Sequence, residues 1–369
     1  MKKIAGLVMT IVLICSMVSP AYAGTGDKET LTLEEAIEMA VENNRQNTID
    51  DLEIRVKEVQ LKKAIEDAAM TGDAYGPERV LENRIRKEVR PMEAQTALEV
   101  ARLRKEDNRR KRALEVYEVF CNILLAGKEL EKETQKLDIQ KEKFEFAKAR
   151  HAAGKLSADA LEEAEYRVIS KSADLESIRE KIRSLETRLK LLLDMDLDDE
   201  LPELKGEIKV VLLREVDIEK VLETSLQFDT SVYEAAGRYN AANLTMQFTE
   251  ELFRAGQATY DTNKSNLEKA LRDYESALKN REVEIRNSYN ELLNIRDSLA
   301  LADRYVDLCM KKLDSAKVKY EKGMIDKEAY LSAKETYIDA LFSRERTRCE
   351  YMIKKENFLS LIRQSGITG

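Results

Sequence analysis

The feature that most constrains this chain is a helical hairpin that occurs twice in the same register. The first copy turns at Gly154 and the second at Gly323, which lie 169 residues apart (323 − 154). The same offset pairs apolar or small residues from position 120 to position 164 of the first copy. An internal duplication explains a register held over this distance, so the sequence predicts two copies of one helical unit. The matched pairs are Phe120 and Tyr289, Ile123 and Leu292, Leu130 and Leu299, Leu137 and Val306, Phe144 and Leu313, Ala147 and Ala316, and Ala164 and Ala333.

A heptad pattern runs through the long helix expected in each copy. In the second copy, apolar or small residues alternate at spacings of three and four, which predicts coiled-coil packing. The equivalent seam of the first copy contains Glu133, Gln140 and His151. Because buried polar groups need partners, we expect this seam to be less tightly sealed or to face a water-filled space. The second seam comprises Leu292, Ile295, Leu299, Ala302, Val306, Cys309, Leu313, Ala316 and Tyr320.

Each copy is expected to contain a short helix, a helix that ends at a break, a long helix and a return helix. Thr32 and Glu35 form a capping box that opens the first short helix, and Asp217 is the expected cap of the second. Glycine and proline mark the first break. The expected helices cover roughly 49–70, a segment disturbed near Pro91 that runs to 153, then 158–193, 230–254, 264–322 and 327–363, with breaks at 71–77 and 255–263, a linker at 194–206 and an insertion in the first copy at 73–91.

The composition excludes several classes of function. Acidic residues outnumber basic ones by 70 to 62, and the two signs are interspersed, which argues against a nucleic-acid partner. His151 is the only histidine, so neither a histidine metal cluster nor a histidine-based catalytic triad is expected. No nucleophile with a base and no glycine-rich phosphate loop stands out. We therefore predict a protein that is not an enzyme and has no catalytic, cofactor or metal site.

The first 23 residues are typical of an export signal. Lys2 and Lys3 precede an apolar stretch at residues 4–18, and residues 21–23 (Ala-Tyr-Ala) fit a signal-peptidase site. Lipidation at Cys15 is the alternative, although the residues before it match a lipobox poorly. No later apolar run is long enough to cross a bilayer as a helix. The predicted division is a signal peptide at 1–23, a first hairpin repeat at 24–206 and a second at 207–369.

Three cysteines remain after the predicted cleavage, and none lies in a CxxC motif. An odd number allows at most one intramolecular disulfide. The simpler interpretation is that Cys121, Cys309 and Cys349 are small core residues.

Three features together carry a resemblance to a known family. Residues 31–36 (Leu-Thr-Leu-Glu-Glu-Ala) are followed by Asn43 and Asn44, a similar turn recurs at both glycines, and the helix order is duplicated. With these features the whole mature chain resembles the TolC-type outer membrane efflux family. The resemblance implies an all-α protomer of long antiparallel coiled-coil hairpins in two tandem repeats. Three such chains would form one helical duct, which is a tube walled by helices.

The resemblance also implies roles for the two turns. They would contact a periplasmic adaptor (a membrane fusion protein) that works with an inner-membrane pump, and Tyr320 would help to close the duct, with charge from Asp326 or Glu328. Purely structural interpretations stand beside these: each glycine is a helix C-cap, and Tyr320 is a core residue. The adaptor-contacting tips would be Gly154, Lys155, Leu156 and Ser157 with Gly323, Met324, Ile325 and Asp326.

The chain departs from the family pattern at its two breaks. Family members carry a pair of membrane-spanning strands there, and such a strand needs about 9–11 residues of alternating polarity. Residues 73–91 are densely charged, and residues 255–263 are too few. The sequence therefore predicts the helical duct without these strands.

Two functions follow. The first is a passive conduit of the cell envelope, in the outer membrane by resemblance, that is homotrimeric and receives cargo from a pump and adaptor. The alternative is a coiled-coil structural or interaction protein without a pore, periplasmic or surface-associated. An adaptor is a third choice, which the lack of a flanking strand-rich segment disfavours.

Overall fold

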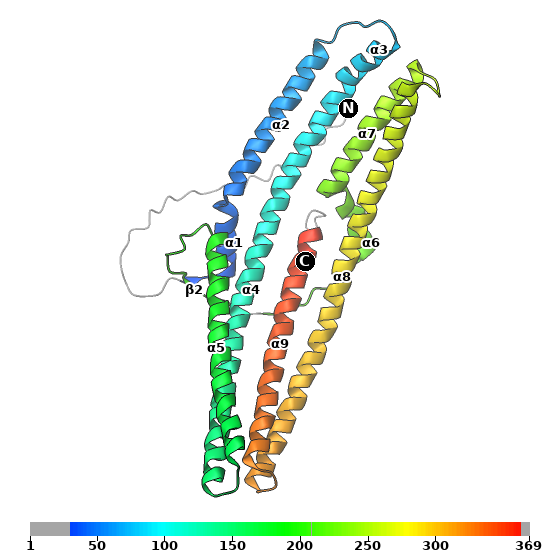
Figure 1. Cartoon of the computed structure of the whole chain (residues 1–369). Coiled ribbons are helices and arrows are strands. Elements are labelled where there is room, and N and C mark those ends of the chain that lie inside the picture. The colour runs from blue at the N-terminus through cyan, green and yellow to red at the C-terminus, as the bar shows by residue number, and fades with distance from the viewer. Residues whose placement is uncertain (1–29, 208, 363–369) are drawn as a thin grey trace, which may run out of the picture.

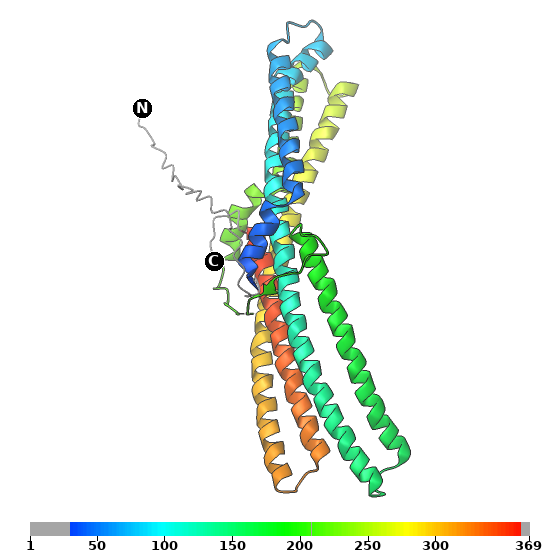
Figure 2. The same cartoon turned by 90° about the vertical axis from the view of Figure 1, so that its left-hand side faces the viewer.

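The computed structural model describes residues 30–207 and 209–362. The predicted signal peptide and Cys15 lie outside the described residues. The described chain is an elongated array of long helices that run along one axis (Figures 1 and 2). Its elements are β1 (Thr30–Leu31), α1 (Leu33–Glu42), α2 (Arg45–Ala69), α3 (Pro77–Arg84), a π-helical turn (Ile85–Val89), α4 (Arg90–Ala152), α5 (Ala158–Leu192), β2 (Glu203–Leu204), α6 (Ile218–Ser225), a 3-10 turn (Leu226–Phe228), α7 (Thr230–Leu252), α8 (Ala258–Glu321) and α9 (Lys327–Ile362).

Two antiparallel hairpins form one half of the molecule. Helices α4 and α5 form the first and α8 and α9 the second, and α4 packs against α9. The order across this half is therefore α5–α4–α9–α8, and both turns lie at the same end (Figure 1). In the other half α2 packs on α4, α4 on α7 and α7 on α8. One edge of the array is consequently α8. The opposite edge is α5 in the half that contains the turns and α2 in the other half.

Two short helices seal the middle of the molecule at equivalent places. Ala36 of α1 is buried in a cluster with Phe120 of α4 and Leu189 of α5. Val221 of α6 is buried in a cluster with Ile285 of α8 and residues of α9. Both helices have the predicted N-caps. Because each short helix covers one hairpin, the core repeats with the duplication.

The predicted caps of the short helices are confirmed. The hydroxyl of Thr32 accepts a hydrogen bond from the Glu35 N–H at 3.3 Å, and the Glu35 carboxylate accepts one from the Thr32 N–H at 2.8 Å. Both bonds of a capping box are therefore present. The side chain of Asp217 accepts from the Lys220 N–H at 3.3 Å.

The predicted heptad seam of α8 is buried in its middle part and becomes more exposed toward the turn, where Leu313 and Ala316 are half-buried and Tyr320 is exposed. Leu292, Leu299, Val306 and Cys309 are each less than a tenth exposed. The disturbance expected near Pro91 is also present, because the Arg90 N–H donates to the Ile85 carbonyl and closes the wider π-helical turn. Proline cannot donate a backbone hydrogen bond, which is one reason why helices distort before it.

The second break is shorter than the sequence suggested. Residues 258–263 were expected to be irregular, but α8 already begins at Ala258 and the break spans only residues 253–257. Gly256 has φ +86°, which lets the chain turn at once. The amide of Asn263 then donates to the Thr249 hydroxyl at 2.8 Å and ties α8 to α7. Residues 258–263, which were expected to form a loop, are thus helical, and Asn263 among them has a hydrogen-bond partner on α7.

In the first copy the additional residues before the long helix are also helical. Residues 77–89 form α3 and the π-helical turn, and they lengthen the hairpin with α2. That helix begins at Arg45, earlier than expected, because Asn44 caps it by accepting from the Gln46 N–H at 2.9 Å.

The linker between the copies is fastened by contacts that the sequence did not predict. Strand β2 pairs in parallel with β1, with Thr30 opposite Glu203 and Leu31 opposite Leu204. Further along, the hydroxyl of Tyr351 accepts from the Leu213 N–H at 2.8 Å. These contacts draw the linker onto the middle of the helical array.

Candidate functional site: the paired hairpin tips

The first tip turn, residues 154–157, ends α4 with a Schellman motif. The Gly154 N–H donates to the His151 carbonyl at 2.9 Å, and the Lys155 N–H donates to the Arg150 carbonyl at 2.8 Å. Gly154 has φ +70°, a conformation that glycine adopts without strain. Ser157 then caps α5 by accepting from the Ala160 N–H at 3.3 Å.

The second tip turn, residues 323–326, repeats this arrangement. The Gly323 N–H donates to the Tyr320 carbonyl at 2.9 Å, and the Met324 N–H donates to the Lys319 carbonyl at 2.8 Å. Gly323 has φ +69°, and Asp326 caps α9 by accepting from the Ala329 N–H at 2.8 Å. The interpretation of both glycines as C-caps is confirmed. It explains the turn motif without reference to any partner.

The side chains at the two turns differ in exposure. Met324 is 69% exposed, and Lys155 is also exposed, whereas Leu156 and Ile325 are half-buried. The Nδ1 atom of His151 lies 2.9 Å from the Leu156 carbonyl, so the ring donates there and closes the first turn. His151 thus has a local structural role.

Tyr320 and Glu328 lie on either side of the second turn and have different surroundings. The Tyr320 ring stacks on that of Tyr330 from α9, with ring centroids 5.4 Å apart, and is 38% exposed. It is therefore neither a fully buried core residue nor a free side chain. Glu328 is exposed and borders a cavity of about 160 Å³ between the hairpins. The cavity is also lined by Gln140, Lys143, Phe146, Ala147, Arg150, Leu156, Ala160, Glu163, Ala164, Arg167 and Leu331.

An ion pair joins the two hairpins near their tips. The ammonium of Lys327, at the start of α9, lies 2.6 Å from the Glu142 carboxylate of α4. This hydrogen bond raises the pKa of Lys327 above its ordinary value. The pair could not be predicted from periodicity, because neither residue occupies a seam position.

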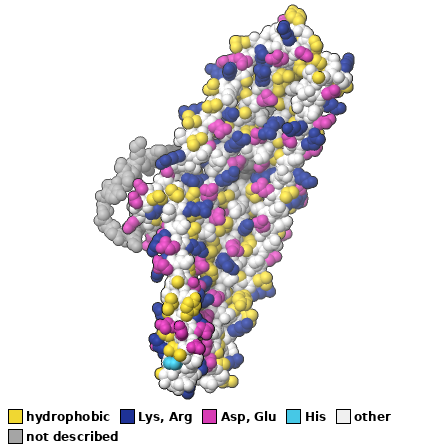
Figure 3. Space-filling model, in the orientation of Figure 1, with side chains coloured by type: hydrophobic (Ala, Val, Ile, Leu, Met, Phe, Trp, Pro, Cys, Tyr) yellow, Lys and Arg dark blue, Asp and Glu magenta, His cyan; other side chains and the backbone are white. Residues whose placement is uncertain are grey.

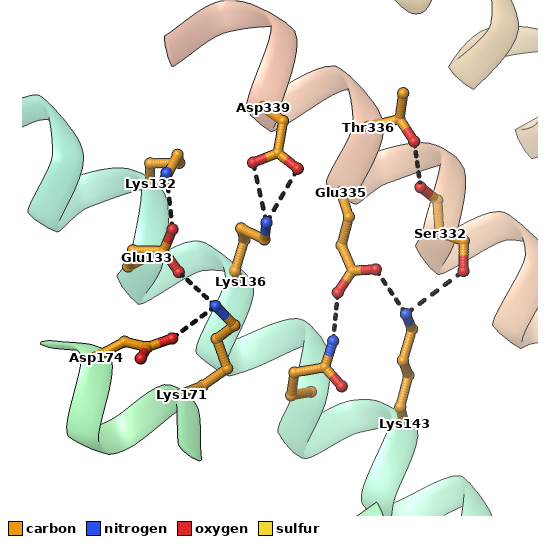
Figure 4. A network of polar contacts seen from close by, with 11 residues as sticks. Lys132, Glu133, Lys136, Lys143, Lys171, Asp174, Ser332, Glu335, Thr336 and Asp339 are labelled. Atoms are coloured by element: carbon orange, nitrogen blue, oxygen red, sulfur yellow. Dashed lines mark hydrogen bonds and ion pairs between the residues drawn. The ribbon is translucent and has the colours of Figure 1, made fainter. Parts of the chain in front are cut away.

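Further along, α4 and α9 are connected by the polar network in Figure 4. Lys136 donates to both carboxylate oxygens of Asp339 at 2.9 Å. Lys143 donates to Glu335 at 2.6 Å, and the Gln140 amide donates to the same carboxylate. Lys136, Lys143 and Glu335 have side chains less than a fifth exposed. These contacts fix the register of α4 against α9.

The same network reaches α5 through Glu133 (Figure 4). Lys171 donates to Glu133 at 3.1 Å and to Asp174 at 2.8 Å, while Lys132 lies 2.7 Å from Glu133. Burial raises the pKa of Glu133, but the hydrogen bonds from Lys132 and Lys171 outweigh it and hold the pKa below its ordinary value. Lys171 shows the converse. Burial lowers its pKa, but its two carboxylate partners outweigh burial, so the pKa lies above its ordinary value.

The expectation of a less tightly sealed first-copy seam holds at Gln140, which is half-buried, and at His151, which is exposed, but not at Glu133. Glu133 and Gln140 have the partners that burial requires. The seam does not face a water-filled space at Glu133, however, since this residue is only 7% exposed. The lysines that neutralise it were missed because they lie beside the seam, where charged residues are usual.

The described residues contain no group of three or more histidine, cysteine, aspartate or glutamate side chains placed to hold a metal ion. None of the helices within 30–207 and 209–362 is both long enough and apolar enough to cross a membrane. On the face drawn in Figure 3, acidic and basic side chains are interspersed along the molecule.

Sequence comparison gives no match, either to a protein-family profile or to a curated protein. Structure comparison does. The chain is similar to CusC (15% identity, TM-score 0.70, covering 93% of this chain and 95% of that one) and to the CmeC outer membrane channel of Campylobacter jejuni (13%, 0.69, 94% and 91%). It is also similar to the outer membrane protein VceC of Vibrio cholerae (13%, 0.66, 90% and 96%). The predicted all-α, TolC-like fold is therefore confirmed over most of the chain.

Proposed function

We propose that the chain is a TolC-type export-duct component of the cell envelope, a passive conduit for cargo that a pump and an adaptor deliver. One observation carries the proposal: a fold shared end to end with outer membrane channel proteins has apolar residues exposed along both of its edges. Such edges are suited to contact with further copies of the chain, which together would form the wall of the duct. The predicted signal peptide supports export.

The first edge is formed by α2. Ile49, Leu52, Val56 and Val59 recur at heptad spacing and are each 53–67% exposed. The opposite face of this helix is already occupied, since Asp51 pairs with Lys105 of α4. An apolar stripe at spacings of three and four is suited to another helix. We therefore assign this stripe to contact with a second copy of the chain.

The second edge is formed by α8. Leu301, Tyr305 and Leu308 are spaced four and three apart and are 47–65% exposed. The two edges differ in sequence, so the contact between copies is head-to-tail, and such contacts close into a ring when the rotation permits. We propose three copies, because the resemblance to TolC-type proteins implies a trimer.

The tips support the second part of the proposal. Both turns protrude at the same end of the molecule (Figure 1), so one partner could contact the exposed residues of both. We propose that residues 154–157 and 323–326 contact a periplasmic adaptor that operates with an inner-membrane pump. Tyr320 and Glu328, which lie just inside the tips, are the proposed closing residues.

The test is the mass of the mature chain, residues 24–369, measured by light scattering in mild detergent and again without it. A trimer in either condition supports the duct. A trimer that dissociates when detergent is removed indicates a membrane-seated duct, and one that persists indicates a conduit that abuts a membrane or another protein. A monomer in both conditions would overturn the duct and favour the alternative, a coiled-coil structural protein of the envelope without a pore.

A further inference from the structure

Two of the three cysteines in the described residues share one buried cluster. Cys121 of α4 and Cys349 of α9 pack together with Tyr117, and Leu125, Met352 and Ile353 surround them. The two cysteines are 6% and 1% exposed. Cys309 of α8 lies in a different cluster, with Val306 and Ala340. Of the three possible pairings of these cysteines, only Cys121 with Cys349 places two of them in one cluster.

We propose that Cys121 and Cys349 form a disulfide that links the first repeat to the second. The thiols are free in this structure, and they lie on helices that pack directly against each other. The two thiols are close enough to share a hydrogen bond, and a disulfide requires their Cβ atoms to approach to about 3.5–4.5 Å. Disulfides form and persist in oxidising compartments, and the predicted signal peptide directs the chain to one.

The position of the pair is not repeated by the duplication. The equivalent of Cys121 in the second copy is Asn290, and the equivalent of Cys349 in the first copy is Glu180. Both of these residues are exposed, and they lie on α8 and α5, the edge helices. The cysteines therefore occur at the contact inside one chain and are absent from the corresponding residues at its edges.

The local chemistry makes the two thiols unequal. The hydrogen bond from Cys121 lowers the pKa of Cys349, although burial opposes this. The same hydrogen bond is the larger cause of a raised pKa of Cys121, and burial is the second cause. Since the thiolate is the nucleophile in disulfide exchange, Cys349 is the first to react.

The oxidant is a disulfide, such as oxidised glutathione or a thiol–disulfide oxidoreductase of the envelope. The Cys349 thiolate attacks one sulfur of this disulfide, which forms a mixed disulfide and releases one thiolate. Cys121 loses its proton and attacks the Cys349 sulfur, so the Cys121–Cys349 bond forms and the second thiolate leaves. Two electrons and two protons pass to the oxidant, which becomes two thiols. The reaction takes place late in folding, once the two thiols share their hydrogen bond and before the surrounding side chains exclude the oxidant.

The test is peptide mapping of the full mature chain after refolding in a buffer of oxidised and reduced glutathione. Remaining thiols are alkylated, and the chain is digested with trypsin without reduction. We expect peptide 113–128, which contains Cys121, to be linked to peptide 349–354, with a loss of two hydrogen masses. Peptide 305–311, which contains Cys309, should carry the alkyl group. Alkylation of all three cysteines, or a bond that includes Cys309, would overturn the proposal.

A second measurement separates the bond from simple packing. In the oxidised protein, a reductant should lower the melting temperature on the order of 5 °C, because the bond closes a long loop. The variant Cys121→Ala with Cys349→Ala should show no response to the reductant, whatever its own stability. The matched control Cys309→Ala should keep the response. If the reductant does not change the melting temperature of the wild-type protein, the bond is absent. This proposal does not depend on the duct, since it is measured on one chain.

Discussion

Gly154 and Gly323 adopt φ values of +70° and +69°, and a Cβ at either position would meet no atom within 4 Å. The cost of Gly323→Ala is therefore backbone strain alone, which we expect to lower the free energy of unfolding by ~1 kcal/mol. The measurement is the midpoint of urea denaturation. Gly127→Ala is the matched control, because Gly127 lies within α4 and is equally unobstructed. It should stabilise the protein by ~1 kcal/mol, and a change of the same sign in both variants would contradict the assignment of the turn.

Glu133 provides a pH-dependent prediction. Its pKa is lower in the folded protein, so its stabilising contribution is complete above the unfolded pKa of about 4.3 and is lost as the pH falls through the folded value. Glu133→Gln should therefore cost ~2 kcal/mol at pH 7, and its difference from wild type should shrink below about pH 4. Thermal unfolding across this range measures both. Glu131→Gln, in an exposed pair with Lys128, should change stability by less than ~0.5 kcal/mol at either pH; a pH-independent deficit in Glu133→Gln would refute the ionic role.

At the scale of helices, Gly237 marks a close approach between α7 and α4. A Cβ at this position would overlap with Cγ2 of Thr96 and lie 3.1 Å from its Cβ. We expect Gly237→Ala to destabilise the protein by ~1–3 kcal/mol through overpacking, although alanine favours a helix. Thr96→Ala removes the nearest atom, so the double variant should recover much of this loss. Unfolding of the four proteins in a double-mutant cycle gives the coupling, and additive effects would mean that the helices separate freely.

The helices were predictable where one local pattern decided the outcome. Periodicity and capping rules account for the helical span of α8 from Leu292 to Tyr320, the caps at Thr32 and Asp217 and both turn glycines. The start of α8 did not follow, because it depends on the contact between Asn263 and Thr249 across two helices. The pairing of β1 with β2 also escaped, since strands of two residues leave no period to detect.

The partners in the polar network could not be predicted for a related reason. The sequence indicated that Glu133 and Gln140 require hydrogen bonds, but not that Lys171 and Glu335 supply them. Those partners depend on the register of α4 against α5 and α9, which is fixed only when the hairpins pack. The tip residues were identified from the turn motif, and their conformation is confirmed. Their contact with an adaptor stays a proposal.

At the scale of the whole molecule, the exposed stripe on α2 predicts what holds copies of the chain together. Val56 is 53% exposed at the centre of this stripe, so Val56→Lys leaves the fold of one chain intact. It places an uncompensated charge in the proposed contact with the next copy, which costs ~2 kcal/mol or more at each of the equivalent contacts. We expect the trimer to dissociate, with an unchanged helical signal in circular dichroism. Light scattering at a fixed protein concentration measures the mass.

The control for this prediction is Asn240→Lys, which adds the same charge to an exposed position of α7. This helix lies between α4 and α8 rather than at an edge, so the mass should remain that of the wild-type assembly. Equal dissociation in both variants would indicate a general effect of charge and not a contact at α2. If the wild-type assembly is trimeric and Val56→Lys stays trimeric too, the copies meet through another surface. The α2 stripe would then need a different partner, because four regularly spaced apolar side chains in water are themselves unfavourable.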